Sequence, residues 1–150
     1  MSKKNFFISW LSSSLIMLVL SLSWHGLFLN DLQRLSYPIE LLIIGGMVIY
    51  LILGFLITQC YLLNFPLFIA KRPLMRALIT GTILGITTYL ITLATGFSFN
   101  GEQKTKYVLF DLTWQIFEQI VGGISVSVIY IWTHDESPID AITRKLFSED

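Results

Sequence analysis

Four long apolar segments separated by short polar ones dominate the pattern along the chain. They cover residues 6–29, 39–63, 77–97 and 107–132. A bilayer core about 30 Å thick is crossed by about 20 apolar residues in a helix, because backbone groups without hydrogen-bond partners are costly there. The pattern therefore predicts four membrane-spanning helices. Their connections are short, so we expect one domain, residues 1–132, in which antiparallel neighbours form an all-α four-helix bundle.

The composition indicates that lipid surrounds these helices. Of the 150 residues, 54% are hydrophobic and only 13% are charged, whereas soluble domains carry about 25% charged residues. The 10 Lys and Arg residues balance the 10 Asp and Glu residues. Zero net charge without a basic tract argues against nucleic acid as a partner. We expect the lipid bilayer as the main partner, with a second copy of the chain or a membrane partner protein as further candidates.

The basic residues predict the orientation of the bundle. An even number of spans places both termini on one side, and the larger group of basic residues lies on that side. By the positive-inside rule, both termini are then cytoplasmic, in the inner membrane of a bacterium. The terminal side carries Lys3, Lys4, Lys71, Arg72, Arg76, Arg144 and Lys145, and the opposite side carries Arg34, Lys104 and Lys106.

The tail, residues 133–150, concentrates charge after the last apolar segment. Ser137, Pro138 and Asp140 fit the N-cap, the first turn and the capping-box position of a short helix. Ile139, Ile142 and Leu146 would lie on one side of it. This pattern predicts a short amphipathic C-terminal helix in a cytoplasmic tail. A solvated tail is favoured over a membrane-surface helix, because acidic residues offset its positive charge.

Three polar residues inside the fourth apolar segment share one helical face. Asp111 and Glu118 differ by about 20° around the axis and Gln115 by about 40°, and Trp114 borders them. A carboxylate within hydrocarbon costs at least ~2.5 kcal/mol, so this stripe is expected to face the other helices.

Two further residues are expected near the outer end of this polar seam. His25 lies close to the end of the first apolar segment, at the same depth as Asp111, and Glu40 begins the second. The group supports three interpretations. In the first, His25 and Asp111 fasten two helices, while Gln115 and Glu118 bond to hydroxyls of the third span. In the second, the group forms a ligand or ion pocket. In the third, His25, Glu40 and Asp111 bind a metal. Metal ligation is the weakest, because no fixed ligand spacing occurs, and we expect neither a metal nor a cofactor. The ligand-pocket interpretation involves His25, Glu40, Asp111, Trp114, Gln115 and Glu118.

Small and aromatic residues carry structural expectations. Gly81 and Gly85 form a small-xxx-small pair that predicts close helix packing, and Gly45, Gly46 and Gly54 are interpreted likewise. Aromatic residues near the span ends fit membrane-interface belts. These are Trp10, Tyr37, Tyr61, Tyr107 and Trp132.

Three functions remain open at this point. The first is binding or transport of a small polar or cationic solute at the polar seam. The second is an accessory or assembly subunit, in which the tail or the face of Gly81 and Gly85 contacts a partner protein. The third is a lipid- or quinone-modifying enzyme with Glu118 or Asp111 as general base. It ranks last, because the sequence has no Gly-x-Ser-x-Gly elbow, phosphate loop, Cys-x-x-Cys or His-Glu-x-x-His motif.

Two short segments carry a family resemblance. Leu93-Ala94-Thr95 ends the third apolar segment, and Asp111-Leu112-Thr113-Trp114 lies early in the fourth. The pair resembles a bacterial family of small four-helix membrane proteins of unknown function. Tyr89, Thr92 and Gln115 stand where that family has Asp, Asn and Gly. The resemblance implies four helices in a bacterial membrane and no particular activity.

Overall fold

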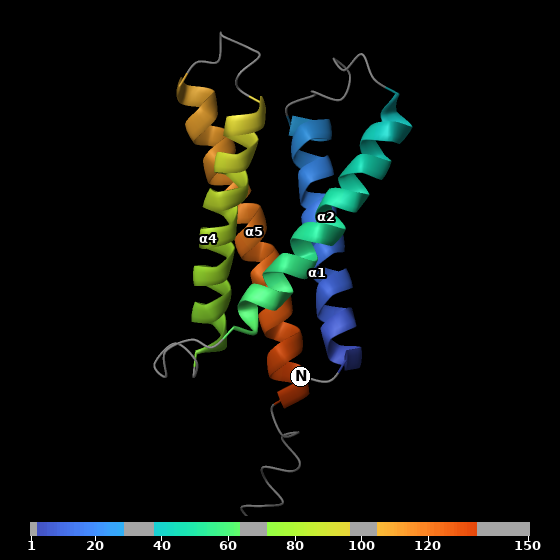
Figure 1. Ribbon diagram of the computed structural model, residues 1–150, viewed down its shortest axis with the longest axis vertical. Helices are drawn as coiled ribbons and strands as arrows, with labels where there is room; N and C mark the ends of the chain where they lie inside the picture. Colours follow the sequence, from blue (N-terminus) through green and yellow to red (C-terminus); the bar gives the residue numbers. More distant parts are fainter. Residues whose placement is uncertain (1–2, 29–37, 64–71, 97–104, 135–150) are drawn as a thin grey trace, which may run out of the picture.

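The structure is a computed structural model that describes residues 3–28, 38–63, 72–96 and 105–134, and these ranges contain four long helices and no strand. They are α1 (Lys3–Ser23), α2 (Ile39–Tyr61), α4 (Pro73–Gly96) and α5 (Thr105–His134), and a π-helical turn η1 (Trp24–Phe28) continues α1. Helices adjacent in the chain run antiparallel (Figure 1). All four are long and apolar enough to span a membrane. The prediction of an all-helical chain with four candidate spans is confirmed.

The helix ends differ by a few residues from the boundaries that hydropathy predicts, and the largest difference is at the start of α4. α2 ends at Tyr61 instead of residue 63, and α4 begins at Pro73 instead of residue 77. Proline is well tolerated in a first helical turn, where its missing N–H has no partner to lose. The backbone N–H of Arg76 donates to the Arg72 carbonyl at 3.1 Å. The first turn of α4 therefore includes a charged residue that an apolar window excludes.

α5 contacts each of the other three helices, as α2 also does, and its most extensive contact is with α4. Glycines bring the backbones of this pair together. A Cβ on Gly81 would lie 2.5 Å from Ile120 Cα, and one on Gly85 would lie 2.7 Å from Ile116 Cα. The prediction of close packing at Gly81 and Gly85 is confirmed. Because α5 covers this face, it is not available to dock a partner protein, and that version of the accessory-subunit hypothesis is wrong.

α1 packs against both α2 and α5. A Cβ on Gly54 would lie 2.0 Å from Ser14 Oγ, and one on Gly122 would lie 2.6 Å from Met17 Sδ. Gly46 is in ordinary contact with Leu18, whereas Gly45 faces open space. The close packing expected of the α2 glycines is therefore found at Gly54 and not at Gly45. The buried apolar core comprises Met17, Ile57, Tyr61, Ala77 and Val126.

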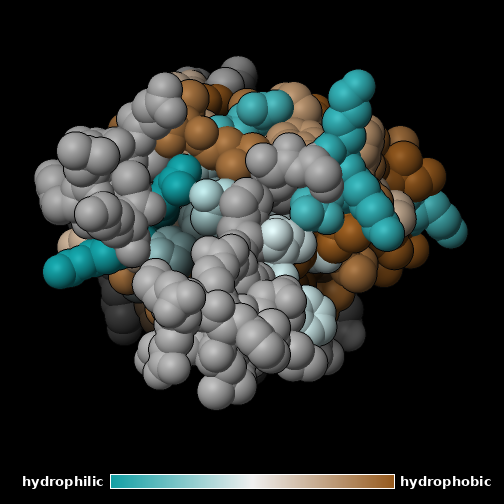
Figure 2. Space-filling view, turned by 90° about the horizontal axis from the view of Figure 1, so that it is seen from below, coloured by the Kyte–Doolittle hydropathy of each residue, from teal (hydrophilic) through white to brown (hydrophobic). Residues whose placement is uncertain are grey.

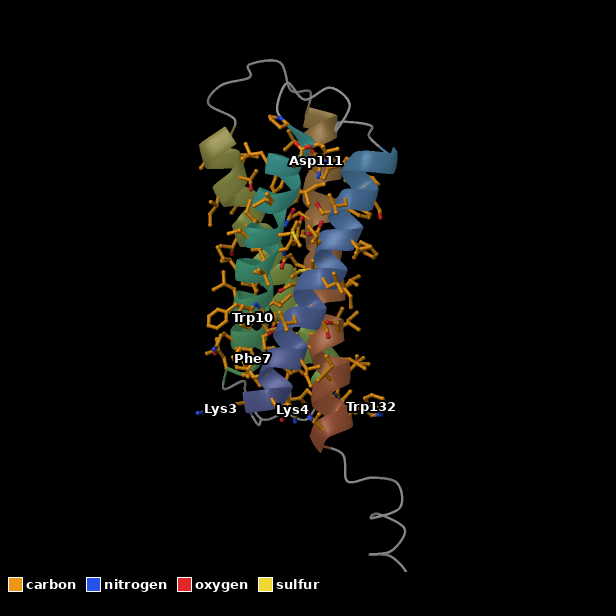
Figure 3. All side chains as sticks on the ribbon, turned by 90° about the vertical axis from the view of Figure 1, so that its right-hand side faces the viewer. Lys3, Lys4, Phe7, Trp10, Asp111 and Trp132 are labelled. Atoms are coloured by element: carbon orange, nitrogen blue, oxygen red, sulfur yellow. The ribbon has the colours of Figure 1, made fainter. Side chains whose placement is uncertain are left out.

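The bundle has two distinct ends. Lys3, Lys4 and Trp132 lie at one end and Asp111 lies toward the other (Figure 3). Viewed onto the first end, hydrophilic side chains project between apolar flanks (Figure 2). Trp132 is 88% exposed, as a belt residue should be, but Tyr61 is fully buried. The belt interpretation of Tyr61 is wrong, because its ring packs inside the core. The amphipathic helix expected within the tail lies outside the described residues.

Candidate functional site

Glu118 is the most deeply buried carboxylate among the described residues. It lies on α5 with 1% of its surface exposed. The Tyr50 side chain of α2 lies against it and also reaches Ser21 of α1, and the Trp114 ring faces it from one turn earlier on α5. Tyr50 thus links the Glu118 carboxyl group of α5 to α2 and, through Ser21, to α1. Even so, Glu118 Oε1 has no hydrogen-bond partner within the described part of the chain.

Further unpartnered polar atoms lie next to Glu118 in the sequence and on α4. Gln119 is fully buried, and neither its amide nitrogen nor its amide oxygen finds a partner among the described residues. The same holds for the Thr80 hydroxyl, which is 3% exposed. Leaving a buried polar group unpaired costs about 1–3 kcal/mol. Each such group in a native structure needs a physical explanation.

Internal fastening predicts that Gln115 and Glu118 meet hydroxyls of the third span, and the structure places only Gln115 there. Gln115 Nε2 lies 3.4 Å from the Thr88 hydroxyl of α4, as that interpretation expects. Glu118 instead lies against Tyr50 of α2. The helical wheel places both on one broad face of α5, but this face is shared between two neighbouring helices.

Trp114 is held by a second tryptophan. Its ring stacks on Trp24 of η1, with centroids 4.1 Å apart and planes 9° from parallel. Phe110 lies 5.2 Å from Trp24, and Phe117 lies 5.4 Å from Trp114. Offset or stacked aromatic pairs add about 0.5–1.5 kcal/mol beyond the area that they bury. The stack therefore fixes the end of the first span against α5 and holds one wall of the Glu118 site.

The outer residues of the predicted site are not gathered around a metal. His25 and Glu40 are exposed, in η1 and in the first turn of α2, whereas Asp111 is half-buried and lies close to Tyr89 of α4. Within the described ranges, no three His, Cys, Asp or Glu residues are placed to hold a metal ion. His25, Glu40 and Asp111 therefore do not form the ligand set considered above. Of the predicted site residues, the structure brings Trp114 and Glu118 together, with Gln115 adjacent on α5.

A second buried charge, Arg76 of α4, was not singled out by sequence reasoning. Its guanidinium donates to the carbonyl of Tyr61, and at 3.4 Å to that of Leu63, beyond the end of α2. Arg76 Cζ lies 4.7 Å from the Tyr61 ring centroid and 5.6 Å from that of Tyr130. The Tyr61 hydroxyl lies 3.3 Å from the Ser127 hydroxyl. We call Arg76, Tyr61, Tyr130 and Ser127 the Arg76 cluster; it joins α2, α4 and α5.

A signal for the Arg76 cluster is present in the sequence. Arg76 precedes Thr80 by one helical turn, and Ala77 precedes Gly81 by one turn. Residues one turn apart share a face. Arg76 thus borders the face that the glycine pair identifies as packed, and it should be expected inside the bundle once α4 is extended back to Pro73.

Two apolar grooves open on the bundle. One lies between α1 and α2 and has a volume of about 250 Å³. The other, about 260 Å³, is lined by the aromatic residues around Trp24 and Trp114. Each groove includes one side chain that also faces Glu118, namely Tyr50 in the first and Trp114 in the second.

No family model, curated protein or solved structure matches this chain. The comparisons therefore add nothing to the resemblance carried by Leu93-Ala94-Thr95 and by the segment Asp111 to Trp114. Arguments about function rest on the geometry of the bundle.

Proposed function

We propose that this chain is a multi-pass membrane protein that binds a small polar or cationic solute at Glu118. The observation that supports this most directly is the carboxylate itself, 1% exposed and with one oxygen lacking a partner among the described residues. A carboxylate in such a place has a large unmet demand for positive charge or hydrogen-bond donors. A bound cation or donor satisfies that demand.

The neighbours of Glu118 favour a ligand over a purely internal role. A buried carboxylate used to fasten helices is expected to accept hydrogen bonds at both oxygens. Glu118 Oε1 accepts none from the described residues. A solute that carries a positive charge matches this oxygen.

For the location, we propose the inner membrane of a bacterium with both termini in the cytoplasm. The support is the excess of basic residues on the terminal side. The observation that Lys3, Lys4 and Trp132 lie at one end of the bundle agrees with an even number of crossings (Figure 3).

The test is binding of two small cations, tetramethylammonium and guanidinium, to purified protein in lipid nanodiscs. Isothermal titration calorimetry measures the affinity for the wild type, for Glu118→Gln and for the matched control Glu40→Gln. Glu40 is an exposed glutamate at the start of α2. We expect Glu118→Gln to weaken binding at least tenfold and Glu40→Gln to leave it unchanged. Equal binding by the wild type and Glu118→Gln would contradict the proposal.

A role as an accessory subunit is the second candidate. It is favoured by the contact of Gln115 with Thr88 and by the Arg76 cluster, because both show polar residues of this chain serving to join helices. This hypothesis predicts that the protein co-purifies with a membrane partner in native nanodiscs. It also predicts that Glu118→Gln reduces the amount of folded protein without changing the binding of any small cation.

A further inference from the structure

The groove between α1 and α2 opens on the outer surface of the bundle. Several of its lining residues, Leu11, Leu15, Met47 and Leu51, are themselves exposed. In a chain that spans a bilayer, an exposed apolar surface on the flank of the helices faces acyl chains. The groove is therefore accessible from lipid and not from bulk water.

Polar atoms are scarce in this groove. It is lined by Leu11, Ser14, Leu15, Leu18, Met47, Tyr50 and Leu51. The Ser14 hydroxyl already donates to the Trp10 carbonyl at 2.8 Å. Tyr50 is then the one lining residue whose polar end is directed elsewhere, and it reaches Ser21 and Glu118.

Tyr50 thus connects an apolar groove with a buried carboxylate. Its ring forms part of the groove, and its hydroxyl lies against Glu118. A ligand that fills the groove comes into contact with the Tyr50 ring, and a cationic group placed beyond that ring meets Glu118. Aromatic rings attract cations, more strongly in surroundings without water.

On the basis of the function proposed above, we propose that the ligand is a lipophilic organic cation that enters from the bilayer through the α1–α2 groove. Its apolar part occupies the groove and its positive charge lies against Glu118, with Tyr50 as the positioning residue between them. The apolar lining disfavours a hydrated inorganic ion, and the carboxylate disfavours a neutral or anionic lipid.

The volume of the groove limits the size of the ligand. A cavity of about 150 Å³ holds one benzene molecule, and the groove offers about 250 Å³. It therefore suits an apolar group of one or two rings. Benzyltrimethylammonium is a suitable probe, since it joins a single ring to a permanent positive charge. Neopentylbenzene has the same shape without the charge, and tetramethylammonium has the charge without the ring.

The second groove is the competing route, because Trp114 belongs to it and also faces Glu118. In that groove, however, the Trp114 ring is stacked on Trp24. Moving Trp114 to admit a ligand would break the stack. In the α1–α2 groove, the Tyr50 side chain alone has to turn aside to admit the charge to Glu118, and no aromatic stack is broken, so we favour this groove.

The experiment measures the affinity of the three probes for protein in nanodiscs by isothermal titration calorimetry. Leu15→Trp places a large ring in the α1–α2 groove, and Thr113→Trp does the same in the aromatic groove. We expect benzyltrimethylammonium to bind at least tenfold more tightly than either other probe. Leu15→Trp should weaken its binding at least tenfold, and Thr113→Trp should leave it within threefold of the wild type.

Variants of Tyr50 test the positioning role. Tyr50→Phe keeps the ring and is expected to retain binding of benzyltrimethylammonium within about threefold, whereas Tyr50→Leu should lose at least tenfold. Circular dichroism and the retained binding of tetramethylammonium show that a variant is folded. A residue that only supported the fold would weaken both cations equally.

Several outcomes would overturn this inference. One such outcome is equal affinity for benzyltrimethylammonium and tetramethylammonium, with both lost in Glu118→Gln. The ring would then contribute nothing to binding, so the proposed function would stand but the role of the α1–α2 groove would be excluded. Weakening by Thr113→Trp instead of Leu15→Trp would assign the other groove. Binding of every probe by Glu118→Gln at the affinity of the wild type would contradict both proposals.

Discussion

The two sides of α5 are built in contrasting ways. Toward α4, glycines bring backbone against backbone, at Gly81 with Ile120 and at Gly85 with Ile116. Toward α1 and α2, larger side chains separate the helices, and Glu118 lies among them with one oxygen unpartnered in the described part of the chain. We call these the closed side and the open side of α5.

The buried polar groups on the two sides differ in how they are partnered. Toward α4, Gln115 meets Thr88, and in the Arg76 cluster Arg76 meets the Tyr61 carbonyl. Gln119 and Thr80 are the exceptions, since their side chains have no partner among the described residues. On the open side, burial is just as deep but the partners are incomplete. Depth of burial alone therefore does not distinguish a binding group from a structural one, and the proposed function rests on the unpartnered oxygen of Glu118.

The largest effect is expected on the closed side, for Gly81→Ala. The new Cβ would lie 2.5 Å from Ile120 Cα, and backbone cannot move aside as a flexible side chain can. α4 must shift away from α5, at a cost of about 3 kcal/mol, the upper part of the range for overpacking. Reversible unfolding in mixed micelles measures the change. A loss of less than about 1 kcal/mol would show that the two helices are not in close contact.

A loss of about 2 kcal/mol in the free energy of unfolding is expected for Arg76→Met. The substitution removes two hydrogen bonds from a charged donor, each contributing about 1.5–3 kcal/mol, and this loss is offset in part because methionine does not bury a charge. It also removes the contacts of the guanidinium with the Tyr61 and Tyr130 rings.

Arg76→Lys is the matched control for this prediction. An ammonium keeps the charge but lacks the planar fork that reaches both the Tyr61 and Leu63 carbonyls, so stability should be recovered only in part. Unfolding is measured in the same mixed micelles. Stability equal to that of the wild type in Arg76→Met would show that the Arg76 cluster does not hold α2 to α4.

The sequence predicts the four helices and the inward position of Glu118, and physical reasons set the limit of that prediction. Apolar length defines a helix that can cross a bilayer, and helical periodicity shows which residues share a face with Glu118. Periodicity does not show which neighbour that face meets. Tyr50 therefore could not be paired with Glu118, although both residues are visible in the sequence.

Arg76 illustrates a second limit. A hydropathy window ends a helix where charge begins, so the first turn of α4 was assigned to a connection. Residues Pro73 to Arg76 form the first turn of α4. Proline is compatible with a helix start because its missing N–H has no partner to lose there, and hydropathy does not detect this. For His25 and Glu40, equal depth in the bilayer predicts a place near Asp111 but not burial, and both side chains are exposed.

On the open side, Glu118→Gln is expected to change the free energy of unfolding by less than about 1 kcal/mol. A small gain in stability would also agree with this expectation. An amide has the shape of the carboxylate but avoids the cost of a buried charge. Binding of small cations should be lost in the same variant. This combination, stable but unable to bind, is the opposite of the result expected for Arg76→Met. A loss of about 2 kcal/mol or more in Glu118→Gln would place Glu118 with the structural residues.

The smallest effect is expected for Gly45→Ala, which serves as the control for Gly81→Ala. Both substitutions add one methyl group to a glycine inside a long apolar helix, so they change helix propensity alike. A Cβ on Gly45 has no neighbour within 4 Å, and stability should change by less than about 0.5 kcal/mol, as at other sites without contacts. If Gly45→Ala were as destabilising as Gly81→Ala, the effect at Gly81 could not be assigned to its contact with α5.

The measurement of Gly45→Ala is repeated at two ratios of protein to lipid. A loss at Gly45 that grows with the proportion of protein would mean that this face of α2 packs against a second copy, and only a loss independent of that ratio would bear on packing within the chain.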